Sequence, residues 1–334
     1  MAFEKVTVLG EKSRDATGLP MTSDMQGVRR AIPADARIGY WTPSDGWKLR
    51  RFDWPAPAPR GRLLFQTGRG DIFEKNLETL AHLHAAGWSV TAFDWRGQGG
   101  SGRLSPDEHV GHVSDFAVYD SDLAAFWADW MAQGEGPTVI LGHSMAGMMV
   151  MRALADRSIS PDVAILVAPM IGLKSPVGAV LAGKVARWMT AHGDPARAAW
   201  RTNERPGSMA SRQTLLTHDV GRYRDEGWWQ DRHPELRLGP PSWAWLAQGF
   251  AGQAALAVDP RIEAIDTPVL MLVAEADKLV DPRAALRLAD RLPDAQVVRF
   301  GPESAHEILR EADTVRDRAL SAIDSFLDAH VPLR

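Results

Sequence analysis

The sequence predicts an α/β protein in which a mostly parallel central sheet carries helices on both faces and a helical cap is inserted. Three observations lead to this prediction. Short apolar runs alternate with amphipathic helical patterns along most of the 334-residue chain. The apolar runs are continuous, which is typical of parallel strands that are buried on both faces. The alternation stops at about residue 171 and resumes at about residue 249.

Composition excludes several classes of protein. The formal net charge is -4 and the charged residues are dispersed, whereas a nucleic-acid-binding protein usually has a basic face, so we expect no nucleic-acid partner. The absence of cysteine excludes disulfides, thiolate metal sites and a thiol nucleophile. No apolar run reaches the roughly 18 residues of a membrane span, and residues 1–7 lack the pattern of a signal peptide. We therefore expect a soluble cytoplasmic protein.

The chain begins with a segment that has no clear pattern. Residues 1–35 show no hydrophobic period and contain several Gly, Pro and Asp residues, so we interpret them as a loosely attached N-terminal arm. The pattern then changes. Residues 38–42 and 47–52 predict two strands, which a turn at Asp45-Gly46 joins.

Strands and helices then alternate, and they form the predicted core of residues 36–170 and 249–334. Predicted strands cover residues 63–66, 90–94, 138–141, 163–167, 269–273 and 296–300. Predicted helices cover residues 72–86, a segment that Ser114 caps, a segment from Ser144, residues 282–292 and the C-terminal part of the chain.

Residues 171–248 interrupt this alternation and differ from the core in composition. They hold six of the thirteen tryptophans, and their eleven Lys and Arg exceed their seven Asp and Glu by four. A structureless loop of this length is improbable inside a compact domain, so we interpret the segment as an inserted helical cap, or lid. The tryptophans suggest an apolar site for an acyl chain, and the surplus positive charge suggests a basic rim.

A serine stands where the predicted strand at residues 138–141 ends. The sequence runs Gly142-His-Ser144-Met-Ala-Gly147, so a hydroxyl lies at a strand-to-helix corner among small residues. Ligands of open parallel sheets bind beyond the carboxyl ends of the strands, and such a corner exposes the serine beside a helix N-terminus. Ala146 occupies a position where this motif usually has glycine. The alternative interpretation is that Ser144 is only the N-cap of a helix that follows a buried strand.

Two further residues have the chemistry that a serine nucleophile needs. A serine hydroxyl is a weak nucleophile until a histidine removes its proton and an acid orients that histidine. Asp277 follows the strand at residues 269–273, and His306 follows the next strand. Ser144, Asp277 and His306 thus occur in the chain order of α/β-hydrolase triads, and each follows a strand. We predict that they are nucleophile, acid and base.

Neighbouring residues compete for two of these roles. Asp281 lies four residues after Asp277, but it directly precedes Pro282 and therefore suits the start of a helix. His143 adjoins Ser144, and we expect it to pack beside the nucleophile rather than to act as its base, because the two side chains point apart. No histidine array suggests a metal site.

At these residues the chain resembles a known family. Gly-His-Ser-Met at residues 142–145, Ala-Glu-Ala-Asp-Lys-Leu-Val at 274–280 and Ala-His-Glu-Ile-Leu at 305–309 resemble the lysophospholipase and monoacylglycerol lipase branch of the α/β-hydrolase fold. The glycine-rich loop at 94–103 and the segment 112–123 are similar to this branch too. The resemblance extends from about residue 36 to 328 and implies an α/β-hydrolase fold with a cap.

The resemblance also implies an oxyanion hole. Its two donors would be the backbone N–H groups of Arg69 and Met145. Thr67-Gly68 stands where the family usually has a His-Gly pair, but main-chain donors do not depend on that side chain. The chemistry that these residues imply needs no cofactor and no metal.

We therefore predict a serine hydrolase that cleaves carboxylic esters through an acyl-enzyme. The resemblance and the tryptophan-rich cap favour small lipid-like substrates, namely lysophospholipids or monoacylglycerols, and a transient contact of the cap with a membrane surface. The alternatives are an aminopeptidase-like or small-ester hydrolase of the same fold, or a catalytically silent relative that binds lipid or a signalling molecule. An aminopeptidase would need an acidic cluster in the cap, which is basic, and the intact triad argues against a silent relative.

Overall fold

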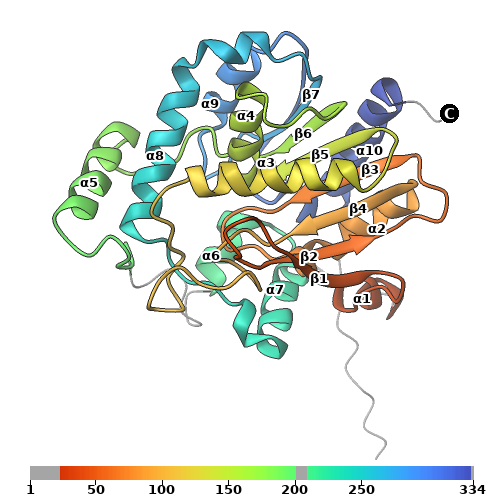
Figure 1. The fold of residues 1–334 in the computed structure, drawn as a ribbon, viewed down its shortest axis with the longest axis horizontal. Helices are drawn as coiled ribbons and strands as arrows, with labels where there is room; N and C mark the ends of the chain where they lie inside the picture. The colour runs from red at the N-terminus through yellow and green to blue at the C-terminus, as the bar shows by residue number, and fades with distance from the viewer. Residues whose placement is uncertain (1–22, 201–208, 332–334) are drawn as a thin grey trace, which may run out of the picture.

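The computed structural model describes residues 23–200 and 209–331, which build one eight-stranded sheet with helices on both sides (Figure 1). The strands are β1 (Arg37–Trp41), β2 (Leu49–Trp54), β3 (Gly61–Gln66), β4 (Trp88–Phe93), β5 (Thr138–His143), β6 (Val163–Val167), β7 (Val269–Ala274) and β8 (Ala295–Phe300). Their order is β1-β2-β4-β3-β5-β6-β7-β8. The pairings of β1 with β2 and of β2 with β4 are antiparallel, and all others are parallel. This confirms the mostly parallel sheet.

Helices connect the strands, and short 3-10 turns lie between them. The α-helices are α1 (Ser23–Arg30), α2 (Leu77–Ala85), α3 (Ala117–Ala132), α4 (Met145–Ala155), α5 (Ala179–Ala191), α6 (Met209–Leu216), α7 (Val220–Arg232), α8 (Trp243–Val258), α9 (Pro282–Ala289) and α10 (Asp313–His330). The 3-10 turns are η1 (Phe73–Asn76), η3 (Pro234–Leu236), η4 (Pro260–Ala264) and η5 (Ile308–Arg310). None of the helices in the described ranges has the length and apolar character needed to cross a membrane.

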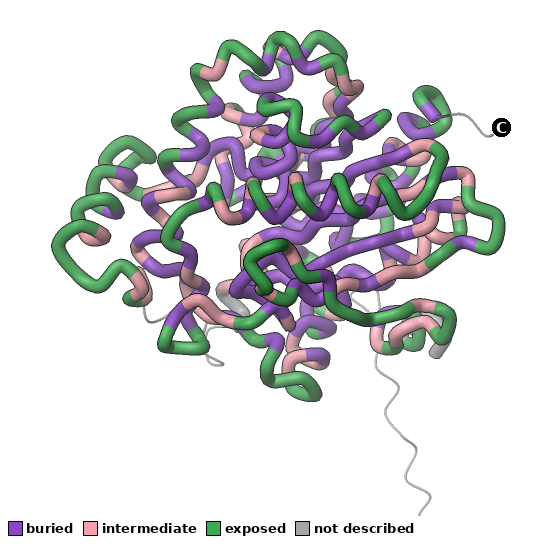
Figure 2. The backbone as a smooth tube through the Cα atoms, viewed as in Figure 1, coloured by how far each residue is buried: buried purple, intermediate pink, exposed green. Residues whose placement is uncertain are grey.

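The two faces of the sheet are buried in separate apolar clusters. Figure 2 shows the central strands in purple, as buried. Successive residues of a strand point to opposite faces, so Ile140 belongs to one cluster while Val139 and Leu141 belong to the other. Helices α3, α4 and α9 contribute side chains to the first cluster, and α2 and α10 contribute to the second. This is why the strands have continuous apolar sequences.

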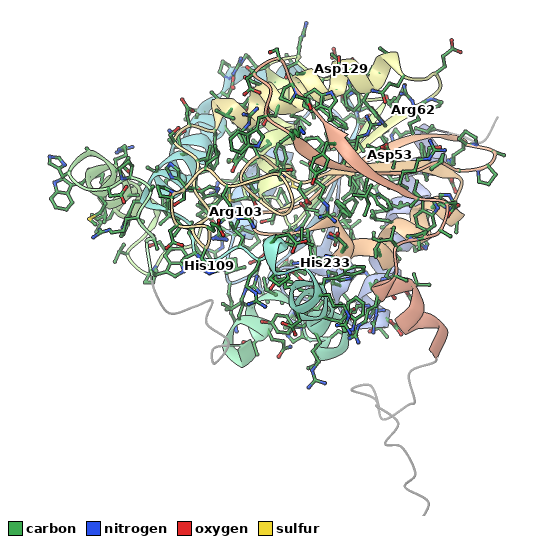
Figure 3. All side chains as sticks on the ribbon, turned by 60° about the horizontal axis from the view of Figure 1, so that its bottom comes forward. Asp53, Arg62, Arg103, His109, Asp129 and His233 are labelled. Carbon is green, nitrogen blue, oxygen red and sulfur yellow. The ribbon has the colours of Figure 1, made fainter. Side chains whose placement is uncertain are left out.

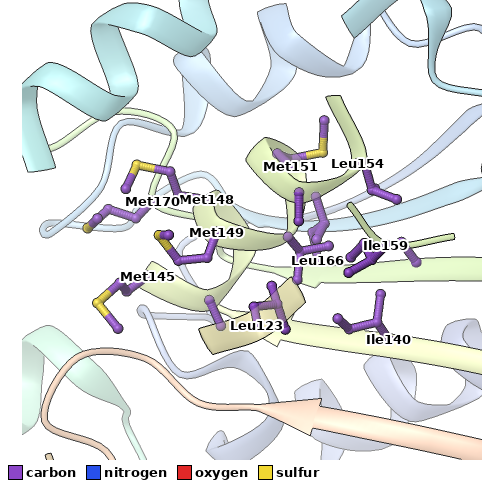
Figure 4. Close-up of a cluster of buried hydrophobic side chains, with 14 of the residues drawn as sticks. Leu123, Ile140, Met145, Met148, Met149, Met151, Leu154, Ile159, Leu166 and Met170 are labelled. Atoms are coloured by element: carbon purple, nitrogen blue, oxygen red, sulfur yellow. The ribbon is translucent and has the colours of Figure 1, made fainter. Parts of the chain in front are cut away.

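Helix α4 is apolar nearly all round because it packs between the sheet and other helices. Figure 4 shows Met145, Met148 and Met149 among Leu123 of α3 and Ile140 of β5. All five side chains are fully buried. The apolar packing fixes the direction in which α4 leaves β5, and therefore the position of the serine that precedes it.

Two local expectations differ from the structure. Helix α3 begins at Ala117 rather than at a Ser114 cap, and Asp115 accepts the N–H of Ala117 instead. The arm was expected to be loosely attached, but its described part is held in place: Arg29 and Arg30 pair with the buried Asp225 of α7. Residues 1–22 of the arm lie outside the described residues.

The segment between β6 and β7 contains helices α5, α6, α7 and α8 and no strand within its described residues. It contacts the core loop that follows β4 at several points: Arg103 donates to the carbonyl oxygens of Glu235 and Arg237, and the N–H of Gly239 donates to the carbonyl of His109 at 2.7 Å. Figure 3 labels Arg103 and His109 on this loop and His233 on the insert beside it. Helix α5 projects at the left of Figure 1, away from the sheet.

Candidate active site

Ser144 lies at the corner between β5 and α4 in a strained backbone conformation. Its φ of 53° and ψ of -114° are outside the regions that a non-glycine residue normally adopts, which costs about 1–3 kcal/mol. The Ser144 N–H donates to the carbonyl of Val167 on β6 at 3.0 Å, and its carbonyl accepts the N–H of Met170 at 2.9 Å. The neighbouring strand therefore holds the corner in place and directs the serine side chain beyond the sheet.

Two positions around Ser144 need glycine, each for its own steric reason. A methyl group added at Gly142 would lie 3.0 Å from the backbone of Ala146, and one added at Gly147 would lie 2.6 Å from Cβ of Pro169. Ala146 itself does not adopt a positive φ and is fully buried. The corner therefore forms with alanine at this position, because the close backbone approaches fall at the two glycines.

Three side chains meet at this corner. The Oγ atom of Ser144 lies 2.8 Å from Nε2 of His306, and Nδ1 of the same imidazole lies 2.6 Å from Oδ2 of Asp277. Asp277 follows β7 and His306 follows β8, so parallel neighbouring strands bring these residues to one edge of the sheet. The arrangement has the connectivity of a catalytic triad, in which the base contacts both the nucleophile and the acid.

The carboxylate of Asp277 is fixed by the backbone as well as by His306. Its Oδ1 atom accepts the N–H groups of Leu279 at 2.7 Å and Val280 at 3.0 Å, and its side chain is buried. Asp281 instead caps α9 by accepting the N–H of Arg283 at 3.0 Å. The structure thus brings Asp277, and not Asp281, to the histidine.

Burial and charge shift the pKa of His306 in opposite directions. Burial lowers the pKa of His306, but the charge and hydrogen bond of Asp277 outweigh it, so the pKa is raised above its ordinary value of 6.5. The pKa of Asp277 is lowered, because its burial is outweighed by His306 and by the two backbone N–H groups. Asp277 therefore stays ionised beside an imidazole that accepts a proton readily.

The turn after β3 lies against the nucleophile. A methyl group added at Gly68 would lie 3.1 Å from Cβ of Ser144. Oδ2 of Asp71 accepts the N–H of Gly68 at 3.1 Å, and Gly70 has a φ of +70° that favours glycine. Arg69, one of the two predicted oxyanion donors, lies in this turn, and the other, Met145, directly follows Ser144. The guanidinium of Arg69 points to the insert, where it donates to the carbonyl of Gly239.

A buried charge cluster behind the site was not anticipated from the sequence. Lys75 contacts Asp71, Glu307 at 2.7 Å and Glu226 at 3.2 Å, with its side chain only 1% exposed. Burial lowers the pKa of Lys75, but the three carboxylates outweigh this effect and raise it. Because Glu226 lies on α7, the cluster ties the insert to the residue after His306. The sequence carried only a weak signal, the spacing of four between Asp71 and Lys75.

His143 packs beside the site without contacting the serine hydroxyl. Its Nδ1 atom lies 3.3 Å from Oδ2 of Asp71, and its Nε2 atom lies 3.4 Å from the carbonyl oxygen of His306. Its ring centroid is 4.9 Å from that of His306. His143 therefore links the turn after β3 to the loop that carries the proposed base.

The tryptophans of the insert do not gather into one apolar site, contrary to expectation. Trp229 and Trp245 are buried in different clusters, whereas Trp188 and Trp200 are exposed. Trp245 packs near the turn after β3, with the Arg69 guanidinium 5.5 Å from the centre of its ring. Most of these side chains hold the insert in place or face outward.

The fold and the Ser-His-Asp geometry define the class as an α/β-hydrolase. A family model described as "Serine aminopeptidase, S33" matches residues 57–313, and the chain belongs to this family.

Within this class the chain is a lysophospholipase-like carboxylic ester hydrolase. It is 33% identical over 271 residues to lysophospholipase L2 of Escherichia coli K12, covering 79% of each chain. It is 28% identical over 282 residues to a probable lysophospholipase L2 of Haemophilus influenzae, covering 82% of this chain and 86% of the relative.

Two solved structures have the same fold. A monoglyceride lipase from Saccharomyces cerevisiae aligns with a TM-score of 0.70 at 19% identity, over 90% of this chain and 98% of its own. A monoacylglycerol lipase from Paleococcus ferrophilus aligns with a TM-score of 0.66 at 22% identity, over 84% and 99%. At these identities the two structures establish the fold alone.

Proposed function

We propose that this chain hydrolyses the ester bond of monoacyl lipids, with Ser144, His306 and Asp277 as its catalytic residues. The observation that carries the proposal is the continuous contact from Ser144 Oγ through His306 to Asp277, at 2.8 and 2.6 Å. The relationship to lysophospholipase L2 supports the substrate class, because a lysophospholipase is named for a monoacyl phospholipid substrate.

In the first half of the reaction the serine is acylated. Ser144 Oγ attacks the ester carbonyl carbon as its proton moves to Nε2 of His306, and Asp277 stabilises the imidazolium that results. The carbonyl oxygen gains a negative charge, which the backbone N–H groups of Arg69 and Met145 would stabilise by about 3–4 kcal/mol each. The bond to the alcohol then breaks, and His306 gives its proton to the leaving oxygen.

The second half of the reaction repeats these steps with water. His306 takes a proton from water, which attacks the acyl carbon of the ester on Ser144. The tetrahedral intermediate collapses, the proton returns to Ser144 Oγ, and a fatty acid leaves. Ester and water thus give acid and alcohol.

An aminopeptidase of the same family is the second candidate, because the family description names one. Such an enzyme needs a carboxylate that is available to bind the substrate's ammonium group. The carboxylates beside the site, Asp71, Glu226 and Glu307, already share Lys75. This pairing favours the ester substrate.

Helix α5 offers a surface through which the insert could meet aggregated lipid. Its exposed apolar side chains include Val180 at 76%, Leu181 at 52% and Trp188 at 59% exposure, and the cationic Lys184 and Arg187 are exposed on the same helix. Figure 2 shows this helix largely in green. Exposed apolar side chains that alternate with cations on one side of a helix suit the interface of an anionic membrane, so we propose a transient contact of α5 with the membrane surface.

A vesicle assay tests this contact. Val180→Asp should weaken sedimentation with vesicles that contain anionic phospholipid and slow hydrolysis of lipid in those vesicles, while the rate on a soluble ester stays unchanged. Val258→Asp is the matched control, since Val258 is equally exposed, at 78%, but lies at the end of α8. Equal vesicle binding of both variants and the wild type would contradict the contact.

Substrate profiling tests the proposed reaction. Each buried methylene contributes about 0.8 kcal/mol, or roughly fourfold, so kcat/KM should rise from acetyl toward longer acyl esters measured below their micelle concentrations. A lysophospholipid and a monoacylglycerol should be cleaved, and a dipeptide anilide should not. A series that falls steadily from the acetyl ester would contradict the lipid substrate, and rapid anilide cleavage would favour the aminopeptidase.

A further inference from the structure

The turn that carries Arg69 is held by side chains from a separate loop, the glycine-rich loop after β4. Trp95 of this loop is fully buried, and its indole Nε1–H donates to the carbonyl of Thr67 at 2.8 Å. Thr67 is the first residue after β3. One side chain of the loop therefore fixes the peptide at the beginning of the turn.

A second side chain of the same loop fixes the end of the turn. Oε1 of Gln98 accepts the N–H of Gly70 at 2.5 Å, and the residue is only 2% exposed. The Nε2 group of Gln98 donates to Tyr119 Oη at 3.3 Å and lies 3.9 Å from Sδ of Met145. Gln98 thus contacts the turn that contains Arg69 and the side chain of Met145. The backbone N–H groups of Arg69 and Met145 are the two proposed oxyanion donors.

The loop is itself rigid enough to act as such a support. The N–H of Gln98 donates to the carbonyl of Trp95, and the N–H of Ser101 donates to the carbonyl of Gln98, both at 2.9 Å. Ser101 Oγ in turn accepts the N–H of Arg50 on β2 at 2.8 Å. The position of Gln98 is therefore set by backbone contacts within the loop and by the neighbouring sheet.

We propose that Gln98, together with Trp95, is a positioning residue that sets the direction of the Arg69 backbone N–H for the oxyanion. The two contacts lie on either side of Arg69, at the Thr67 carbonyl and the Gly70 N–H, so they limit rotation of the one peptide between them, which carries the Arg69 N–H. An oxyanion donor is effective only when it already points to the oxygen of the transition state, and small misplacements are costly. This inference rests on the proposed function.

The test compares two buried glutamines that each accept one backbone N–H. Gln98→Met removes the acceptor for Gly70, and Gln253→Met removes the acceptor for Leu173 on the insert. We expect Gln98→Met to lower kcat by about tenfold with little change in KM, since the contact acts mainly in the transition state. Affinity for an alkyl boronic acid, which forms a tetrahedral adduct with serine, should fall in parallel. Gln253→Met should leave both unchanged, even if it lowers Tm.

Trp95→Phe gives the same test if Gln98→Met does not fold, because it removes the donor to Thr67 and keeps an aromatic ring. The inference is overturned if the folded variant keeps kcat and boronate affinity within about twofold of the wild type, or if Gln253→Met loses as much. A different result would show that the proposed function itself is wrong: hydrolysis would survive in Ser144→Ala. If only this inference is wrong, hydrolysis still depends on Ser144.

Discussion

The Oδ2 atom of Asp277 lies 2.6 Å from the Nδ1 atom of His306. This contact assigns the imidazole proton to Nδ1 and leaves Nε2 to face the Ser144 hydroxyl at 2.8 Å. The other oxygen of Asp277 is held by two backbone N–H groups, so the carboxylate cannot turn away without losing them. The geometry therefore prepares a histidine base before any substrate binds.

The first prediction concerns the acid. Asp277→Asn should lower kcat by about three to four orders of magnitude, because the imidazole loses its tautomer and its charge partner, as in serine proteases. Asp281→Asn should change kcat little, since Asp281 caps α9 and asparagine is also a good cap. Steady-state kinetics on a soluble ester measures both variants. A larger loss in Asp281→Asn would show that the acid is misassigned.

The pH dependence of the reaction should report the raised pKa of His306. The imidazole must be neutral to take the serine proton, so kcat/KM should fall as the pH drops through a pKa above the ordinary 6.5. Asp277→Asn removes the carboxylate that raises this pKa, and the midpoint of its residual activity should move to lower pH. A wild-type midpoint at or below 6.5 would contradict the proposed role of Asp277.

The steric requirements at the corner lead to a third prediction. Gly147→Ala should greatly reduce folded, active protein, because its methyl group would lie 2.6 Å from Cβ of Pro169. Ala146→Gly restores the usual motif and should retain near-normal kcat, with a small loss of Tm from a helix glycine. Soluble yield, Tm and kcat are the measurements. Equal behaviour of the two variants would mean that Pro169 moves aside.

A fourth prediction concerns the stability of the fold. Burial, followed by the nearby Glu74, raises the pKa of Asp94 to about 7 although Arg50 opposes the shift. The folded state therefore holds this proton more tightly than the unfolded chain, and the resulting stabilisation is lost progressively as the pH rises from the ordinary pKa of 3.8 to about 7. Asp94→Asn should make Tm less dependent on pH between about 4 and 7. If the plots of Tm against pH for variant and wild type are parallel, Asp94 is not the origin of this pH dependence.

Sequence patterns were sufficient to predict those residues of the site that lie directly after strands. Ser144, Asp277 and His306 each follow a strand of the parallel sheet, and continuous apolar runs mark such strands. Because the carboxyl ends of parallel strands share one edge, residues far apart in the chain could be placed together. The Asp45-Gly46 turn was also predictable, since Gly46 needs its φ of 81°.

Contacts that depend on tertiary packing were not predictable in this way. Lys75 lies in a segment of helical pattern, and nothing local reveals that α7 covers it with Glu226. The capping role expected of Ser114 falls to Asp115, because both residues can cap and the tertiary fold decides between them. The exposure of Trp188 and the burial of Trp229 likewise depend on which helices pack against them.

The central claim is that Ser144 is the nucleophile, and a fluorophosphonate probe tests it most directly. The serine lies at the corner beside the N-terminus of α4, 2.8 Å from its base, so the probe should form one covalent adduct with the wild type. Peptide mass spectrometry should place that adduct on Ser144, and Ser144→Ala should lose both the adduct and ester hydrolysis. An adduct on another serine, together with hydrolysis that survives in Ser144→Ala, would contradict the account.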